Sequence, residues 1–279
     1  MRASLVAALL SLSLVSLSGA APSVRADYIT GELTDVNGNG LFGGILSPGA
    51  GVTINLGDGS SPSVAYYPGV VNWTVKTPPA GKPNASWAPA VGSNFTTFCI
   101  ELPQEIYPGN VYTYQLTALA NAPNPGTPPA QATPGTPGMG AIKAGAIEEL
   151  WGQDHSSIGT NGTDGAAFQL AVWKLEYDWG TSAFDSFSAG NFRATGNTTA
   201  LAQARSWLDA VKNNPNSATP ANLIALTDPY IQDQVTELPG GAQPHLAAPA
   251  PPGVTLAAIG AFFLLLFVRR HRTPALVRG

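Results

Sequence analysis

Two residues of this sequence could react with each other: the single cysteine, Cys99, and a glutamine on a largely apolar segment, Gln169. A thiolate that attacks a carboxamide carbon expels ammonia and leaves an internal acyl–sulfur bond, which is a latent electrophile. One cysteine cannot form an intramolecular disulfide, so in an exported protein Cys99 is either buried as a small apolar side chain or chemically occupied. The alternative is that Cys99 fills the core while Gln169 hydrogen-bonds to the backbone.

The segment 164–179 predicts the helix that would position Gln169. Apolar side chains recur there at helical spacing, namely Phe168, Val172, Leu175 and Trp179. Asp164, or Thr163 before it, is the expected N-cap. Gln169 would then lie in the first turn, where free amides and the helix dipole favour a thiolate and stabilise an oxyanion.

The segment 96–102 predicts the strand that would carry Cys99. Phe98, Ile100 and Leu102 alternate with the cysteine, so Cys99 should point to the opposite face of the strand.

The two segments resemble the paired motifs of the Cys–Gln thioester domains of bacterial surface proteins. The first reads Phe98-Cys99-Ile100-Glu101, an aromatic-Cys-aliphatic-polar motif. The second is Gln169-Leu170-Ala171-Val172-Trp173, and Phe168 before it stands where many members have threonine. The resemblance implies that Cys99 and Gln169 are joined by a thioester. An aromatic shell of Phe98, Phe168 and Trp173 could keep water from this bond.

The two ends of the chain predict export. Residues 1–26 have the charge, apolar core and small-x-small ending of a signal peptide, so the mature chain would begin at Asp27. A Pro-rich stalk, 239–253, precedes the apolar run 254–268, which spans roughly 22 Å and is followed by arginines. The plain interpretation is a membrane anchor with the arginines inside. The tail 254–279 also resembles a PEP-CTERM sorting signal, which implies processing by an exosortase-type protease.

The charge distribution argues against nucleic acid as a partner. The predicted ectodomain, 27–238, holds all 17 acidic residues and only seven basic ones, so its net charge is −10. Such a surface repels phosphates. The three histidines are scattered without metal-ligand spacing, and the sequence predicts neither a metal nor another cofactor.

The order of the predicted elements favours an α+β fold, in which a helical portion of about three helices is inserted in an antiparallel sandwich or barrel-like β framework. Strands are predicted at 28–33, 41–46, 51–56, 63–67, 70–75, 96–102, 111–118 and 230–238, and helices at 141–151, 166–179 and 198–213. Asp35-Val-Asn-Gly-Asn-Gly40 predicts a hairpin turn rather than a calcium loop, because Leu46 stands where that loop needs a glutamate. The Pro- and Gly-rich stretch 121–139 predicts a mobile insertion.

Three functions are compatible with these features. The first is a cell-surface or matrix adhesin that captures an amine-bearing surface or polymer covalently, in a single turnover rather than as an enzyme. The second is a non-covalent structural or carbohydrate-binding matrix module, with Trp73, Trp87, Tyr112 and Tyr114 available to stack on sugars. The third is a secreted hydrolase, for which no Gly-x-Ser-x-Gly motif is found.

Overall fold

The computed structural model describes residues 27–36, 52–56, 64–66, 68–102, 104–123, 138–158 and 162–240. The predicted signal peptide, the strand at 41–46, most of the insertion and of the stalk, and the whole of the tail lie outside these residues.

Six antiparallel strands form a closed barrel, which confirms the predicted α+β fold with an antiparallel β framework. Around the barrel the order is β1 (Tyr28–Val36), β4 (Val71–Val75), β5 (Asn94–Cys99), β9 (Gln234–Glu237), β8 (Leu223–Thr227) and β6 (Val111–Ala118). Full closure leaves this sheet with no unpaired edge strand. The strands come from both ends of the chain, so β5 lies beside β9, more than 130 residues away in sequence.

The barrel core explains why these segments form strands. On β4, Val71, Trp73 and Val75 are buried and alternate with half-buried residues. The ring of Trp73 contacts the rings of Tyr114 and Tyr112, with centroids 5.7 and 6.0 Å away. The hypothesis that Trp73 and Tyr114 stack on sugars is therefore wrong, because both are at most 1% exposed and serve the core.

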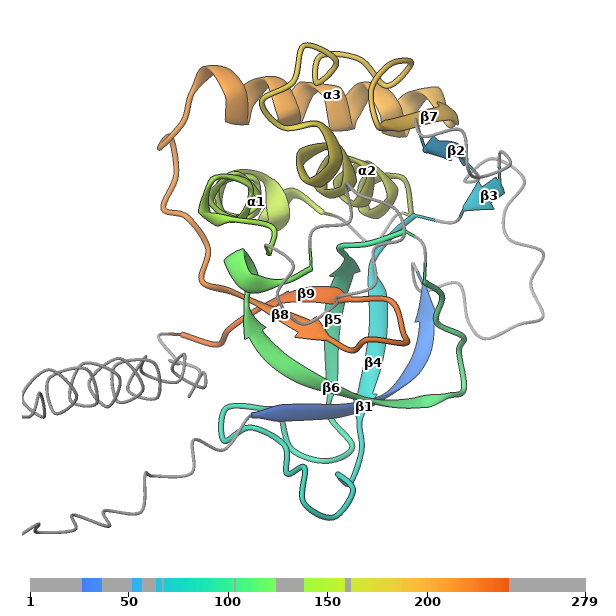
Figure 1. Cartoon of the computed structure of the whole chain (residues 1–279), viewed down its shortest axis with the longest axis vertical. Helices are drawn as coiled ribbons and strands as arrows, with labels where there is room; N and C mark the ends of the chain where they lie inside the picture. Colours follow the sequence, from blue (N-terminus) through green and yellow to red (C-terminus); the bar gives the residue numbers. More distant parts are fainter. Residues whose placement is uncertain are drawn as a thin grey trace, which may run out of the picture.

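Three helices lie together on one side of the barrel (Figure 1). They are α1 (Ala141–Asp154), α2 (Gly162–Asp178) and α3 (Thr198–Asn213), with 3-10 turns at Leu119–Asn121 and His155–Ser157. The sequence predicts Asn197 or Thr198 as the cap of α3, and the structure shows that it is Asn197, whose side chain accepts a hydrogen bond from the Ala200 backbone amide. Every residue of α2 from Gly165 to Asp178 is buried, which makes α2 the central element of the fold.

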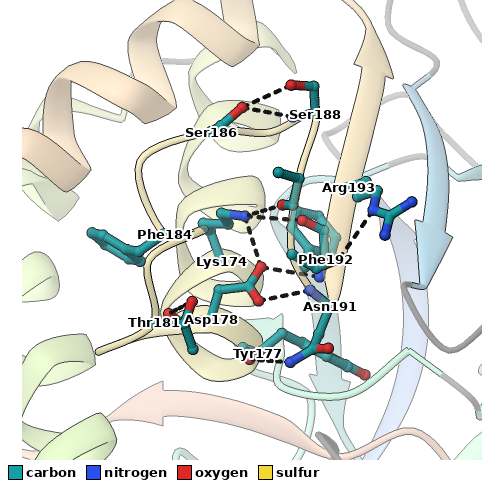
Figure 2. Close-up of polar contacts among 12 residues, drawn as sticks. Lys174, Tyr177, Asp178, Thr181, Phe184, Ser186, Ser188, Asn191, Phe192 and Arg193 are labelled. Atoms are coloured by element: carbon teal, nitrogen blue, oxygen red, sulfur yellow. Dashed lines mark hydrogen bonds and ion pairs between the residues drawn. The ribbon is translucent and has the colours of Figure 1, made fainter.

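A second sheet of three strands has the order β3 (Val64–Tyr66), β2 (Val52–Leu56) and β7 (Phe192–Gly196). Figure 2 shows how the C-terminal end of α2 holds the chain that leads into β7. The ammonium of Lys174 donates to Asp178 and to the carbonyls of Ala189 and Phe192, at 2.7 to 3.0 Å. The Asp178 carboxylate also accepts from the backbone amides of Asn191 and Phe192. The strand β7 is not among the strands predicted from the sequence.

Gly190 is required beside this ion pair. Its φ of +97° favours glycine, and a Cβ there would lie 2.4 Å from the Asp178 carboxylate.

Candidate functional site

The position of Gln169 on its helix differs from the prediction. The helix α2 begins at Gly162, so Asp164 lies inside its first turn and Gln169 is the eighth helical residue. An acidic residue is favoured both as a cap and in the first turn, which is why the sequence did not separate the two. The helix dipole acts mainly within the first turn, so it does not supply the stabilisation of an oxyanion at Gln169 that we expected.

The carboxamide of Gln169 instead forms hydrogen bonds with both backbone groups of Cys99. Its Oε1 accepts from the Cys99 amide at 2.7 Å, and its Nε2 donates to the Cys99 carbonyl at 2.7 Å. The Gln169 side chain is fully buried. The structure therefore places the two residues in direct contact, although 70 residues separate them in the chain.

This contact continues the hydrogen-bond ladder of the barrel. The pairing of β4 with β5 ends at Val71 and Thr97, so no β4 residue faces Cys99. The next amide along the chain, that of Ile100, donates to the backbone carbonyl of Asp233, which precedes β9. Because backbone groups alternate between the two neighbouring strands, those of Cys99 point away from β9. The Gln169 amide takes the place of the missing strand residue there.

The thiol of Cys99 lies between two glutamines that the sequence analysis did not single out. The sulfur donates to Gln232 Oε1 at 3.0 Å, and Gln234 Nε2 donates to the sulfur at 3.3 Å. Gln232 also donates through Nε2 to the carbonyl of Glu101, at 2.8 Å. The available signal was a pair of glutamines two residues apart on the predicted closing strand, since such residues share one face.

Two residues of the predicted aromatic shell contact each other. Phe98 and Phe168 pack together with ring centroids 4.7 Å apart, and Trp151 lies 5.6 Å from Phe98. His155 stacks on Trp151 at 4.3 Å, so α1 and the following turn add two rings that we had not predicted. Trp173 is buried and packs against Phe192, 5.9 Å away.

Three buried carboxyl groups, those of Glu101, Asp233 and Glu176, form a cluster next to the cysteine. Burial raises the pKa of Glu101 to about 8 and that of Asp233 to about 9. Glu176 of α2 is fully buried, and burial together with the charge of Glu101 raises its pKa well above the usual value. Burial also raises the pKa of the Cys99 thiol to about 12, although its hydrogen bond with Gln234 opposes this shift. The thiol is thus neutral near pH 7.

These carboxyls predict that the protein loses stability as the pH rises. Glu101 and Asp233 titrate near 4.5 and 3.8 when unperturbed and near 8 and 9 in the fold. Between those values the folded state binds more protons than the unfolded state, so the stabilisation is complete at the acidic end and is lost toward the alkaline end. We expect the free energy of unfolding to be larger at pH 5 than at pH 8 by at least about 1 kcal/mol.

Urea unfolding at these two pH values measures this difference, and Glu101→Gln should reduce it. His155 acts in the opposite sense, because burial lowers its pKa. Equal stability at the two pH values in both proteins would show that the carboxyls are already ionised in the fold.

No group of three or more His, Cys, Asp or Glu side chains within the described ranges is arranged to hold a metal ion. In that same part of the chain, no helix is both long and apolar enough to cross a membrane. In comparisons with known proteins, no family model, no curated protein and no solved structure matches the chain.

Proposed function

We propose that this chain is an exported cell-surface or matrix protein in which Cys99 and Gln169 form an internal thioester that captures amines covalently. The observation that carries the proposal is the fully buried Gln169 carboxamide, hydrogen-bonded at 2.7 Å to each backbone group of Cys99. Sulfur is two covalent bonds from the Cys99 Cα, which lies between these groups. The nucleophile and the carboxamide carbon therefore occupy one small region.

The reaction would change the hydrogen bonds of the Cys99 backbone. When the thiol sulfur bonds to the Gln169 carbonyl carbon, the side-chain nitrogen departs as ammonia. The Cys99 carbonyl then loses the donor that Nε2 provided, whereas the Cys99 amide keeps its acceptor. The buried aromatic rings of Phe98, Phe168 and Trp151 exclude water, which would otherwise hydrolyse the product. An incoming amine then attacks the same carbon, forms an amide with the Gln169 side chain and frees the thiol.

The cellular setting belongs to the same proposal. The N-terminal 26 residues would direct export, and the tail after the stalk would hold the protein at the membrane or be processed by a sorting protease. The partner would be an amine-bearing surface or extracellular polymer. Each capture consumes one thioester, so the protein would act once rather than as an enzyme.

Intact-mass measurement of the freshly purified chain tests the proposal. We expect a mass lower by one ammonia and a Cys99 that does not react with thiol reagents. Added methylamine should attach at Gln169 and release one thiol. Cys99→Ala and Gln169→Ala should abolish both effects, and Gln115→Ala, which changes an exposed glutamine of β6, should leave them intact.

A full-mass protein whose folded form neither releases ammonia nor binds methylamine would contradict the thioester. The function left would be a non-covalent matrix module. For that alternative the structure offers a groove of about 360 Å³ lined by Trp87, Phe95, Trp151, His155 and Glu237, among others. Trp87 is half-buried there, unlike the core residue Trp73.

A further inference from the structure

Glu101 is the ionisable residue nearest to Cys99 along the chain. It follows Cys99 by two residues, and the Ile100 amide between them donates to the backbone carbonyl of Asp233. Gln232 ties the two positions together, because its Oε1 accepts from the Cys99 sulfur while its Nε2 donates to the Glu101 carbonyl.

The Glu101 carboxyl is buried without full hydrogen bonding. The residue is 2% exposed, and among the described residues its Oε1 has no hydrogen-bond partner. A buried oxygen without a hydrogen-bond partner destabilises a fold, so a fold that served stability alone would gain from an apolar side chain here. The negative charge of Glu101 also helps to raise the pKa of the Cys99 thiol.

Several titratable groups face Glu101 or Cys99 from the surrounding elements. Glu176 faces them from α2, Tyr114 from β6, and Asp233 from the residue that precedes β9. Lys143 of α1 faces Glu176, and Asp228 lies beside Asp233. Glu176 has two oxygens without a hydrogen-bond partner in the described chain, like the one of Glu101. It is seven residues beyond Gln169, which places it about 10 Å farther along the helix axis.

We propose that Glu101 is the proton carrier for the condensation of Cys99 with Gln169, an inference that rests on the proposed thioester. The Glu101 carboxylate accepts the proton as the S–H bond breaks, and the sulfur forms its bond to the Gln169 carbonyl carbon. The C–N bond of the carboxamide then breaks, and the Glu101 carboxylic acid gives the proton to the departing nitrogen. Ammonia leaves, Glu101 is a carboxylate again, and no further reactant is needed.

Re-formation of an opened thioester measures this step directly. The full-length protein is treated with ammonium, which restores the Gln169 carboxamide and the free thiol, and is then desalted. The return of the bond is followed as loss of one ammonia from the intact mass and loss of the alkylatable thiol. General acid–base groups contribute about 10²–10⁴-fold, so Glu101→Gln should slow re-formation at least about 100-fold.

Glu176→Gln is the matched control, because it removes an equally buried carboxyl of the same cluster. We expect it to re-form the bond within about threefold of the parent rate, since Glu176 lies far from the reacting carbon along α2. Glu101→Asp should recover part of the lost rate. The pH profile adds a readout that a merely structural role would not change, namely a rate that rises as the pH passes about 8, the pKa of Glu101. Glu101→Gln should lack this rise.

The outcomes separate this inference from the proposed function. If the parent protein never loses ammonia, the thioester itself is wrong, and the role of Glu101 is wrong with it. If the parent forms the bond and Glu101→Gln forms it equally fast, only the role of Glu101 is overturned. If both glutamine variants are slowed equally, the assignment to Glu101 is also overturned, because the effect then belongs to the cluster. Circular dichroism of each variant confirms that it is folded.

Discussion

Replacing Lys174 with methionine is expected to lower the free energy of unfolding by about 3–5 kcal/mol, because it leaves the Asp178 carboxylate buried without its counter-charge. Lys174 is not exposed at all and Asp178 only 1% exposed, so water cannot replace the lost partner. The methionine also leaves the carbonyls of Ala189 and Phe192 without the donor that the ammonium provides (Figure 2). Urea unfolding of the variant and the parent measures the loss.

The matched control is Lys212→Met, which removes an equivalent charge from an exposed pair. Lys212 and Asp185 are 43% and 50% exposed, and exposed pairs of this kind contribute little to stability. Combining Lys174→Met with Asp178→Asn removes both charges and should cost less than the sum of the two single changes. Additive costs, or a Lys174→Met variant as stable as Lys212→Met, would mean that the ion pair does not hold the segment before β7.

This ion pair also explains one limit of the sequence analysis. The strand β7 is five residues long, and its pairing with β2 joins residues that are 136 to 144 positions apart. Its local pattern alone does not distinguish it from a loop. The segment before it is held by Lys174 and Asp178. In the sequence these two residues indicate only an ion pair four residues apart on one helix, and not a contact with another segment. The cap of α3, by contrast, depends on neighbouring residues alone, and the sequence narrowed it to Asn197 or Thr198.

The candidate site, too, could be predicted only in part from the sequence. The alternation around Cys99 predicted a strand at 96–102, and the periodicity around Gln169 predicted an amphipathic helix. In the structure the strand ends at Cys99, and the helix is buried from Gly165 to Asp178. The contact of Cys99 with Gln232 and Gln234 depends on how β9 closes the barrel, across 133 and 135 residues of chain. No local pattern contains that information. The N-terminal end of α2 was misplaced because Asp164 is suited to two adjacent positions.

Gln169 should stabilise the fold whether or not the thioester forms, and this can be measured in a Cys99→Ala background where no cross-link exists. Gln169→Leu in that background leaves the amide and the carbonyl of residue 99 buried without partners. Each such group costs about 1–3 kcal/mol, so we expect the free energy of unfolding to fall by about 2–5 kcal/mol. Gln115→Leu on the barrel surface is the control and should change it by less than about 0.5 kcal/mol.

Gln169→Glu in the same background distinguishes loss of hydrogen bonds from loss of shape. A protonated glutamic acid has one acceptor oxygen and one O–H donor, so it can satisfy both backbone groups of residue 99 as the amide does. An ionised carboxylate has no donor and faces a carbonyl oxygen inside the protein. We therefore expect Gln169→Glu to be nearly as stable as its background at pH 5 and to approach Gln169→Leu at pH 8. Parallel stabilities of the two variants at both pH values would show that packing, and not the paired hydrogen bonds, is what Gln169 provides.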